Sequence, residues 1–144
     1  MARYRGRYSF RGDELRSKFE LKLAEALHSA GIKYHYERYQ YEYYTKVTNG
    51  VCDDCAGTCV YKRQWYTPDF FLPSGIVVEA KGHFTASNRT TLKAVRDAHD
   101  SLDLRLVFMA DNKINRNSGV KYSDWCEQHG FQYAFKTIPE EWYK

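Results

Sequence analysis

The sequence predicts an α/β fold in which helices flank a mixed central sheet. Apolar runs at 76–80 and 104–109 enclose a helical stripe at 90–99, and such a strand–helix–strand unit pairs its strands in parallel by default. The stretch 66–82 has the pattern of a strand, a turn and a strand, which adds an antiparallel pair. Another stripe at helical spacing begins at Leu15 and supplies a helix that can cover the sheet.

Composition favours one domain that binds a negatively charged polymer. The 144 residues carry 22 Lys and Arg against 18 Asp and Glu, a net charge of +4, and 17% of them are aromatic. A basic arm at 1–12 precedes a single domain at 13–144. The arm either contacts phosphates by charge or is a solubilising terminus, and both interpretations stay open. The candidates for contacts with nucleic-acid phosphates are Arg3, Arg5, Arg7, Arg11, Lys93 and Arg96.

We expect a soluble intracellular protein, because the chain starts without an apolar leader and contains no run long enough to span a bilayer. Its four cysteines are too few and too unevenly spaced for the disulfide framework of a small secreted domain. The sequence also has no internal repeat that would divide the domain.

The first helix is expected to begin after Asp13 as its N-cap and to stop at Gly31. Glu20 lies one residue off its apolar stripe and has two interpretations. In Ser17-x-x-Glu20 it matches a capping box, although the stripe already begins at Leu15 and a cap at Ser17 would leave a turn unused. At the flank of the stripe, Glu20 could instead reach a site on the sheet, and spacing alone leaves both open.

Residues 34–47 alternate tyrosines with polar side chains and predict one long strand. A strand of this length is exposed at an edge unless something pairs with it, and pairing across a two-fold axis is one solution. The dipeptide Asn49-Gly50 signals a turn, and residues 61–66 form a return strand that leads into the 66–82 hairpin.

The insertion at 48–62 contains Cys52, Cys55 and Cys59 in the spacing C-x2-C-x3-C. Three thiolates on such a loop could bind a structural Zn²⁺, with Cys126 or a histidine as the fourth ligand. The alternative is free thiols in a reducing compartment, because the sequence lacks the second C-x2-C pair that most structural zinc sites use.

The candidate chemistry lies in the hairpin at 66–82. Asp69 precedes the turn, while Glu79 and Lys81 share one face of the strand after it, so the hairpin can bring the three side chains together. Two carboxylates on adjacent strands can hold Mg²⁺ or Mn²⁺, and a neighbouring lysine can stabilise charge on a phosphate. The alternative is an ordinary exposed pair of Glu79 and Lys81. Because Asp69 stands on the other arm, we favour a metal-dependent phosphodiesterase.

The remaining elements complete the domain. Ser123 is expected to cap a short helix that runs through His129, residues 131–135 form a last strand, and residues 138–143 pack a tail that contains Trp142.

These motifs, in this order, resemble a known family. The matching segments are Arg16-Ser17-x-Phe19-Glu20, Gly31-Ile32-Lys33-Tyr34, Tyr66-Thr67-Pro68-Asp69-Phe70, Leu72-Pro73-x-Gly75-Ile76, Glu79-x-Lys81-Gly82, 102–108, Cys126-Glu127-x-His129-Gly130 and Ile138-Pro139-x-Glu141-Trp142. They are similar to endonuclease I of the T-odd bacteriophages, a family of four-way (Holliday) junction resolvases within the PD-(D/E)xK nuclease superfamily. The resemblance spans about residues 10–143, whereas the insertion with its cysteines has no counterpart in the family pattern.

The resemblance implies a restriction-endonuclease-like fold and a catalytic set of Glu20, Asp69, Glu79 and Lys81. Asp69 and Glu79, with Glu20, would bind Mg²⁺ or Mn²⁺, two ions in each active site, and Lys81 would be the positive partner. It also implies a domain-swapped homodimer in the host cytoplasm, in which Glu20 comes from one chain and the other three residues from its partner. Residues 34–47 would then be the bridge between chains, and two sites related by a dyad would nick opposing strands of a four-way DNA junction symmetrically.

Two other functions fit part of the pattern. A restriction or transposon end-cleaving nuclease would share the metal site and show no preference for junctions. A non-catalytic module that binds DNA junctions would keep only the fold, and a decayed site would be expected to have lost a carboxylate or the lysine. All four residues of the implied catalytic set are present.

Overall fold

The computed structural model describes residues 8–46 and 61–144 of the chain. Its centre is a five-stranded sheet with the order β3-β6-β7-β8-β9. The strands are β3 (His35–Tyr36), β6 (Phe70–Phe71), β7 (Val77–Lys81), β8 (Leu104–Phe108) and β9 (Tyr133–Phe135). The pairs β3–β6 and β6–β7 are antiparallel, whereas β7–β8 and β8–β9 are parallel. The mixed sheet and the parallel pairing of the two apolar runs are therefore confirmed.

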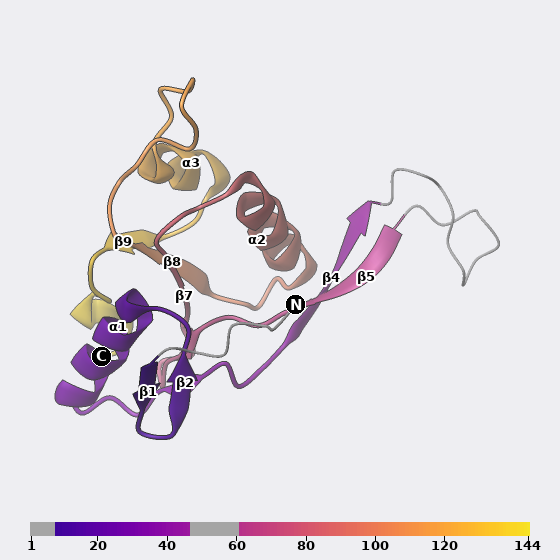
Figure 1. The fold of residues 1–144 in the computed structure, drawn as a ribbon. Helices are drawn as coiled ribbons and strands as arrows, with labels where there is room; N and C mark the ends of the chain where they lie inside the picture. The colour runs from indigo at the N-terminus through magenta and orange to yellow at the C-terminus, as the bar shows by residue number, and fades with distance from the viewer. Residues whose placement is uncertain (1–7, 47–60) are drawn as a thin grey trace.

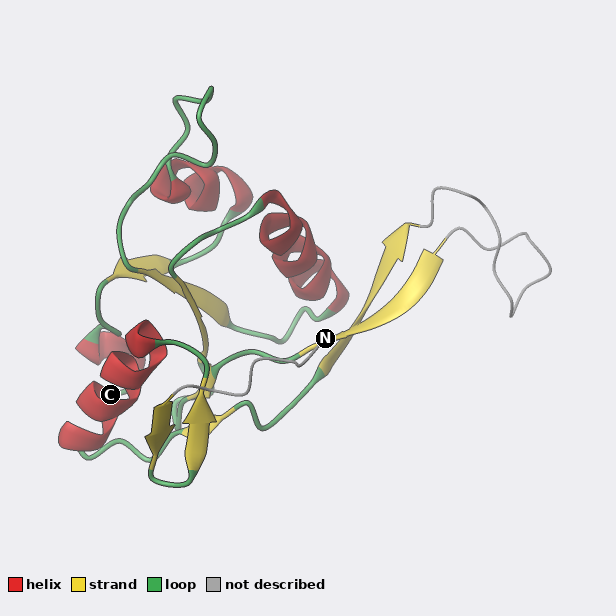
Figure 2. Cartoon of the chain, viewed as in Figure 1, coloured by secondary structure: helices red, strands yellow, loops and turns green. Residues whose placement is uncertain are grey.

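Helices cover both faces of this sheet, as Figures 1 and 2 show. Helix α1 (Lys18–Ser29) and the 3-10 helix η1 (Glu140–Trp142) pack on one face. The opposite face is covered by α2 (Ala86–Ala98) and α3 (Tyr122–His129). A hairpin of β1 (Tyr8–Phe10) and β2 (Asp13–Leu15) precedes α1 and packs beside it.

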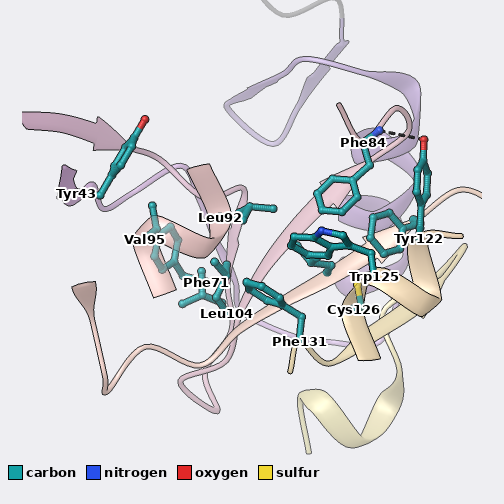
Figure 3. Close-up of a cluster of buried hydrophobic side chains, with 13 residues drawn as sticks. Tyr43, Phe71, Phe84, Leu92, Val95, Leu104, Tyr122, Trp125, Cys126 and Phe131 are labelled. Atoms are coloured by element: carbon teal, nitrogen blue, oxygen red, sulfur yellow. Dashed lines mark hydrogen bonds between the residues drawn. The ribbon is translucent and has the colours of Figure 1, made fainter. Parts of the chain in front are cut away.

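The sheet separates two hydrophobic cores, because successive side chains of a strand point to opposite faces. On β7, Val77 belongs to the core under α2 and α3, and Val78 belongs to the core under α1. The first of these cores is drawn in Figure 3, where Phe84 packs edge-on against Trp125 at a ring distance of 5.0 Å. The packing of these two cores therefore determines toward which face of the sheet each side chain at the end of β7 points.

The predicted single strand at 34–47 is divided in the structure. Strand β3 joins the central sheet, and the chain then breaks before β4 (Tyr41–Lys46), which pairs with β5 (Tyr61–Tyr66). The break includes Glu37, whose φ of +49° is in the left-handed region that interrupts an extended chain. The return strand is confirmed, and the β4–β5 ribbon projects from the body of the domain (Figure 1).

The start of the first helix differs from the prediction. Asp13 and Leu15 belong to β2, after a turn at Arg11 and Gly12 with φ values of +50° and +90°. Helix α1 begins at Lys18, and its N-cap is Ser17, whose hydroxyl accepts a hydrogen bond from the backbone N–H of Glu20 at 3.1 Å. The apolar residue at position 15 therefore packs from a strand rather than from the helix that follows it.

Two further helix starts were also misplaced. Helix α2 begins at Ala86, earlier than the stripe at 90–99, because Thr85 caps it in a reciprocal capping box with Asn88. Helix α3 begins one residue before Ser123, whose hydroxyl and backbone N–H both donate to the Asp111 carboxylate instead of capping the helix.

Candidate active site

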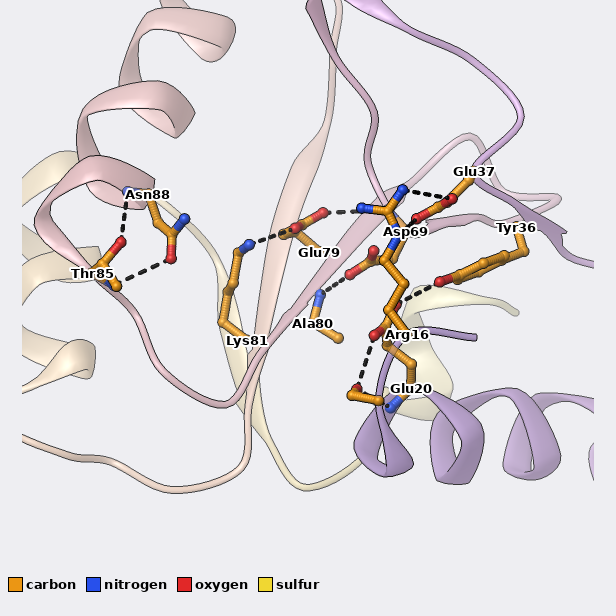
Figure 4. A network of polar contacts seen from close by, with 11 residues as sticks. Arg16, Glu20, Tyr36, Glu37, Asp69, Glu79, Ala80, Lys81, Thr85 and Asn88 are labelled. Atoms are coloured by element: carbon orange, nitrogen blue, oxygen red, sulfur yellow. Dashed lines mark hydrogen bonds and ion pairs between the residues drawn. The ribbon is translucent and has the colours of Figure 1, made fainter. Parts of the chain in front are cut away.

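The β6–β7 hairpin brings Asp69, Glu79 and Lys81 together, as the sequence predicts (Figure 4). The register pairs Phe70 with Val78, so one step further along the strands Asp69 lies opposite Glu79. The backbone N–H of Asp69 donates to the Glu79 carboxylate at 3.2 Å, and the ammonium of Lys81 lies 3.0 Å from the same carboxylate. The Asp69 carboxylate in turn accepts from the backbone N–H of Ala80 at 2.9 Å.

Glu20 reaches this cluster from α1, within the same chain. Its side chain is only 6% exposed, and its carboxylate accepts hydrogen bonds from the hydroxyls of Ser17 at 2.8 Å and Tyr36 at 2.7 Å. Ser17 therefore both caps the helix and orients the Glu20 carboxylate. Both interpretations of Ser17-x-x-Glu20 hold in part, since Ser17 is the cap and the glutamate faces the sheet.

Glu37 is a site residue that the sequence reasoning missed. One carboxylate oxygen each from Glu20, Glu37 and Asp69 lie within 4.8 Å of one another. The backbone N–H of Glu37 donates to the carbonyl of Asp69 at 2.8 Å, and its carboxylate lies 3.0 Å from Nε of Arg16. In a continuous strand of alternating tyrosines, Glu37 looks like a solvated residue. The break after β3 brings it to Asp69.

The closest three-carboxylate group differs from the predicted set of metal ligands. Glu20 and Asp69 belong to it, whereas the oxygens of Glu79 contact Lys81 and the backbone of Asp69. Asp69 is thus the residue that touches both Glu79 and the Glu20–Glu37 pair. All four side chains offer carboxylate oxygens, which are the ligands that Mg²⁺ and Mn²⁺ prefer.

Burial and mutual repulsion shift the acids toward their protonated forms. Burial is the largest cause that raises the pKa of Asp69 well above its ordinary value, and the charges of Glu79 and Glu20 raise it further. Burial also raises the pKa of Glu79, against the opposing effect of Lys81. The pKa of Glu37 is raised by burial as well, partly offset by Arg16. A divalent cation would favour the ionised forms, so these residues fit such an ion.

Tyr66 is a second residue that the sequence reasoning missed. Its hydroxyl oxygen is buried beside Glu79, and among residues 8–46 and 61–144 it makes no hydrogen bond of good geometry. Burial, followed by the charges of Glu79 and Asp69, raises its pKa well above the ordinary value, so the phenol stays protonated beside these carboxylates. Tyr66 opens the matching segment Tyr66-Thr67-Pro68-Asp69-Phe70, but nothing in that segment assigned a role to its hydroxyl, and the chain has 13 tyrosines.

Apart from Glu37, these side chains line one pocket of about 350 Å³. Its lining residues are Arg16, Glu20, Trp65, Tyr66, Thr67, Asp69, Glu79, Ala80 and Lys81. Helix α1, the end of β5 and the β6–β7 hairpin therefore each contribute one wall.

The other predicted contact residues lie elsewhere. Arg11 is in the exposed turn between β1 and β2, and Lys93 is on α2. Arg96 bonds to the His129 carbonyl and lies 4.4 Å over the Phe131 ring, so its guanidinium holds α2 against α3. The predicted phosphate contacts Arg3, Arg5 and Arg7 lie outside the described residues.

The predicted zinc ligands Cys52, Cys55 and Cys59 also lie outside the described residues. Cys126, considered as a fourth ligand, is fully buried in the core under α3, and burial raises the pKa of its thiol to about 12. Cys126 packs among the apolar side chains of that core, and the zinc site stays a prediction, because the three cysteines of the insertion lie outside the described residues.

Comparison with known sequences decides the family. The profile of the family described as phage endonuclease I matches residues 1–144. The chain belongs to the phage endonuclease I family. Endonuclease I of Escherichia phage T7 is 37% identical to it over 130 residues, which are 90% of this chain and 78% of the relative. Endodeoxyribonuclease 1 of Enterobacteria phage T3 is 36% identical over 129 residues, 89% of this chain and 76% of the relative.

The family assignment confirms the resemblance that the motifs indicated. Within the described residues, none of the helices of this endonuclease I family member has the length and apolar character needed to cross a membrane.

Proposed function

We propose that this member of the endonuclease I family is a metal-dependent endodeoxyribonuclease that resolves four-way DNA junctions. The observation that carries the proposal is the meeting of Glu20, Asp69, Glu79 and Lys81 in one pocket. The T7 relative is named an endonuclease and the T3 relative an endodeoxyribonuclease, and together the two names support an endonuclease that cuts DNA. A hairpin with an Asp on one strand and an E-x-K triplet on the next supports placement in the PD-(D/E)xK superfamily.

The proposed reaction is hydrolysis of a phosphodiester. A water oxygen bonds to phosphorus, the bond from phosphorus to one sugar oxygen breaks, and that oxygen receives a proton. Asp69 and Glu79, with Glu20 and Glu37, would hold Mg²⁺ or Mn²⁺, and bound ions would lower the pKa of the attacking water and neutralise charge on the phosphate. The Asp69 carboxylate lies within 4.8 Å of those of Glu20 and Glu37, and Glu79 stands opposite Asp69 on the next strand, so we include two ions in each site as part of the proposal.

The chain's own groups have further proposed roles. Lys81 is partly exposed, with 21% of its side chain accessible, so its ammonium could contact the phosphate while it pairs with Glu79. Ser17 and Tyr36 orient Glu20 through their hydroxyls. Tyr66 stays protonated and offers a donor inside the pocket.

Symmetric cleavage of a junction needs two active sites, so we include a homodimer in the proposal. The β4–β5 ribbon, which projects from the domain, is the proposed bridge (Figure 1). In this structure, Glu20 and Asp69 meet within one chain. An exchange of the segment that carries α1 would form the same pocket between two chains.

The decisive experiment compares a four-way junction with linear duplexes of the same arm sequences. We expect paired nicks in opposing strands of the junction with Mg²⁺, and binding without nicking when Ca²⁺ replaces Mg²⁺. Equal rates on the junction and the duplexes would favour a general DNA endonuclease. Binding without any nicking in Mg²⁺ or Mn²⁺ would favour a junction-binding module.

The exchange can be tested with mixed dimers that pair one wild-type chain with one chain that carries both Glu20→Gln and Glu79→Gln. If each site is built within one chain, the mixed dimer keeps one intact site and nicks one strand. If α1 is exchanged, each site contains one altered chain and nicking is lost. Mixed dimers that carry Glu141→Gln, an exposed substitution in η1, are the matched control.

A further inference from the structure

Three lysines surround a second hollow beside the active site. Lys18, Lys22 and Lys136 line a cavity of about 240 Å³, together with Phe19 and Met109. Lys18 and Lys22 are four residues apart on α1, so they lie on the same face of the helix, one turn from each other. Lys136 comes from the opposite side, directly after β9.

The register of the parallel strands places this hollow near Lys81. Lys81, Phe108 and Phe135 are partners across β7, β8 and β9, so the residues that follow them also lie side by side. The residue directly after β8 is Met109, whose N–H donates to the Lys81 carbonyl at 3.4 Å, and the residue directly after β9 is Lys136. Two strand spacings of about 4.8 Å separate β7 from β9, roughly 10 Å in all.

The backbone of Lys136 is an independent sign of a functional constraint. Its φ of +69° is in the left-handed region, where a non-glycine residue is strained. Its N–H donates to the Phe108 carbonyl at 2.7 Å, which fixes the start of the side chain. A glycine would adopt this conformation without strain. The turn alone therefore does not account for a lysine at position 136.

The charges of the hollow are uncompensated. Within residues 8–46 and 61–144, no carboxylate forms an ion pair with Lys18, Lys22 or Lys136. Three ammonium groups around one cavity repel one another, and a bound anion would relieve that repulsion. The apolar side chains of Phe19 and the half-exposed Met109 offer a surface for a sugar ring.

We propose that this hollow binds a DNA backbone phosphate on the strand whose phosphodiester is cut at Lys81. The proposal rests on the proposed function, because it takes DNA as the substrate. The roughly 10 Å separates strand backbones, and consecutive phosphates of one strand are farther apart than the rise of about 3.4 Å between bases, so we place the second phosphate about one or two nucleotides from the cut. The subsite contacts the backbone only, so it positions the strand and carries no base preference.

The first test measures DNA affinity against salt. The triple variant Lys18→Gln, Lys22→Gln, Lys136→Gln is compared with a charge-matched control that replaces the exposed Lys33, Lys113 and Lys121, which line neither pocket. Junction binding is measured in Ca²⁺ between 50 and 200 mM salt, roughly the range over which phosphate contacts are lost. We expect the triple variant to bind about tenfold more weakly, with a salt slope smaller by about 0.9, and the control to keep the wild-type slope. Equal slopes in both variants overturn the proposal.

The second test locates the phosphate. Neutral methylphosphonate replaces each phosphate in turn for four nucleotides on either side of the cut. Wild-type protein should lose affinity at a position about one or two nucleotides away, and the triple lysine variant should lose nothing further there. Equal losses in both proteins at every position would overturn the subsite.

A third measurement separates binding from folding. Lys136→Gly removes the side chain and relieves the left-handed backbone, so we expect a Tm equal to or higher than that of wild type together with weaker DNA binding. Unchanged DNA binding contradicts the proposal. These binding tests are independent of nicking: a wild-type protein that binds through the subsite but never nicks a junction disproves the proposed function and leaves the subsite standing.

Discussion

Helix α1 serves two neighbouring regions of opposite chemistry. Glu20 points inward, is almost fully buried and is oriented by two hydroxyls. Lys18 and Lys22 point to the adjacent hollow, where no carboxylate of the described residues pairs with them. In the acidic pocket, hydrogen bonds hold Glu20, and burial raises the pKa of Asp69 and of Glu79. In the lysine hollow, the charge is open to a ligand. The first arrangement suits chemistry on a bound group, and the second suits holding a strand.

The largest effect is expected from substitutions in the acidic pocket, which should abolish nicking and leave DNA binding intact. Glu79→Gln keeps the shape of the side chain and removes its charge, and Lys81→Ala removes the cation beside it. We expect either change to lower Mg²⁺-dependent nicking by roughly a thousandfold or more, because charge stabilisation at the phosphate is lost. Junction affinity in Ca²⁺ should stay within about threefold, since the lysine hollow is intact. Gel assays of nicking and binding measure both, and undiminished nicking would contradict the assignment of the pocket.

A smaller effect is expected from Glu37→Gln, which tests the residue that the sequence did not mark. Loss of one carboxylate from the Glu20–Glu37–Asp69 group should raise the Mg²⁺ concentration needed for half-maximal nicking by about 10- to 100-fold. Glu141→Gln, on an exposed position of η1, is the matched control and should leave the Mg²⁺ titration unchanged. An unchanged Mg²⁺ titration for Glu37→Gln would show that this glutamate binds no metal and only pairs with Arg16.

Tyr66→Phe distinguishes a working hydroxyl from a packing residue. The change removes a buried oxygen that lies beside Glu79 without a well-formed hydrogen bond among the described residues, so we expect a nearly unchanged Tm. If the hydroxyl donates to a group in the pocket, nicking should fall by about tenfold while the KM for the junction stays the same. A lower Tm with full activity would show that Tyr66 serves packing alone. Thermal melting and steady-state kinetics provide the two readings.

The smallest expected effect is on stability against pH. The pKa values of Asp69 and Glu79 are raised in the folded protein, so between their ordinary and raised values the folded state binds more protons than the unfolded state. Stability of the metal-free protein should therefore be highest below the ordinary carboxyl range and fall as pH rises through the raised values. Asp69→Asn should flatten this fall, and Mg²⁺ should oppose it. Melting temperatures from pH 4 to 8, with and without Mg²⁺, measure the effect, and a Tm profile unaltered by Asp69→Asn would contradict it.

Sequence patterns predicted the parts of the site that lie on one hairpin. Asp69, Glu79 and Lys81 are linked by a short turn and by alternation along β7, so local geometry is enough to bring them together. The same holds for the parallel pairing of β7 and β8, which follows from an intervening helix.

The parts that sequence did not predict depend on chain breaks and on capping. Glu37 enters the site because its left-handed φ ends β3, and no glycine or proline marks that position. The start of α1 was placed too early because Leu15 fits the helical stripe while it packs from β2. In both places, tertiary packing decided between patterns that the local sequence allows equally.

The register across β7, β8 and β9 sets the spacing between the ends of these strands. Backbone hydrogen bonds between the strands fix the separation of the chain at Lys81 from the chain at Phe135, the residue before Lys136. Loops that leave these strands, such as the segment between β8 and α3, can change length without altering that distance. The spacing of the two proposed contacts with DNA would therefore depend on the sheet. The surrounding loops could change in length and sequence without altering that spacing.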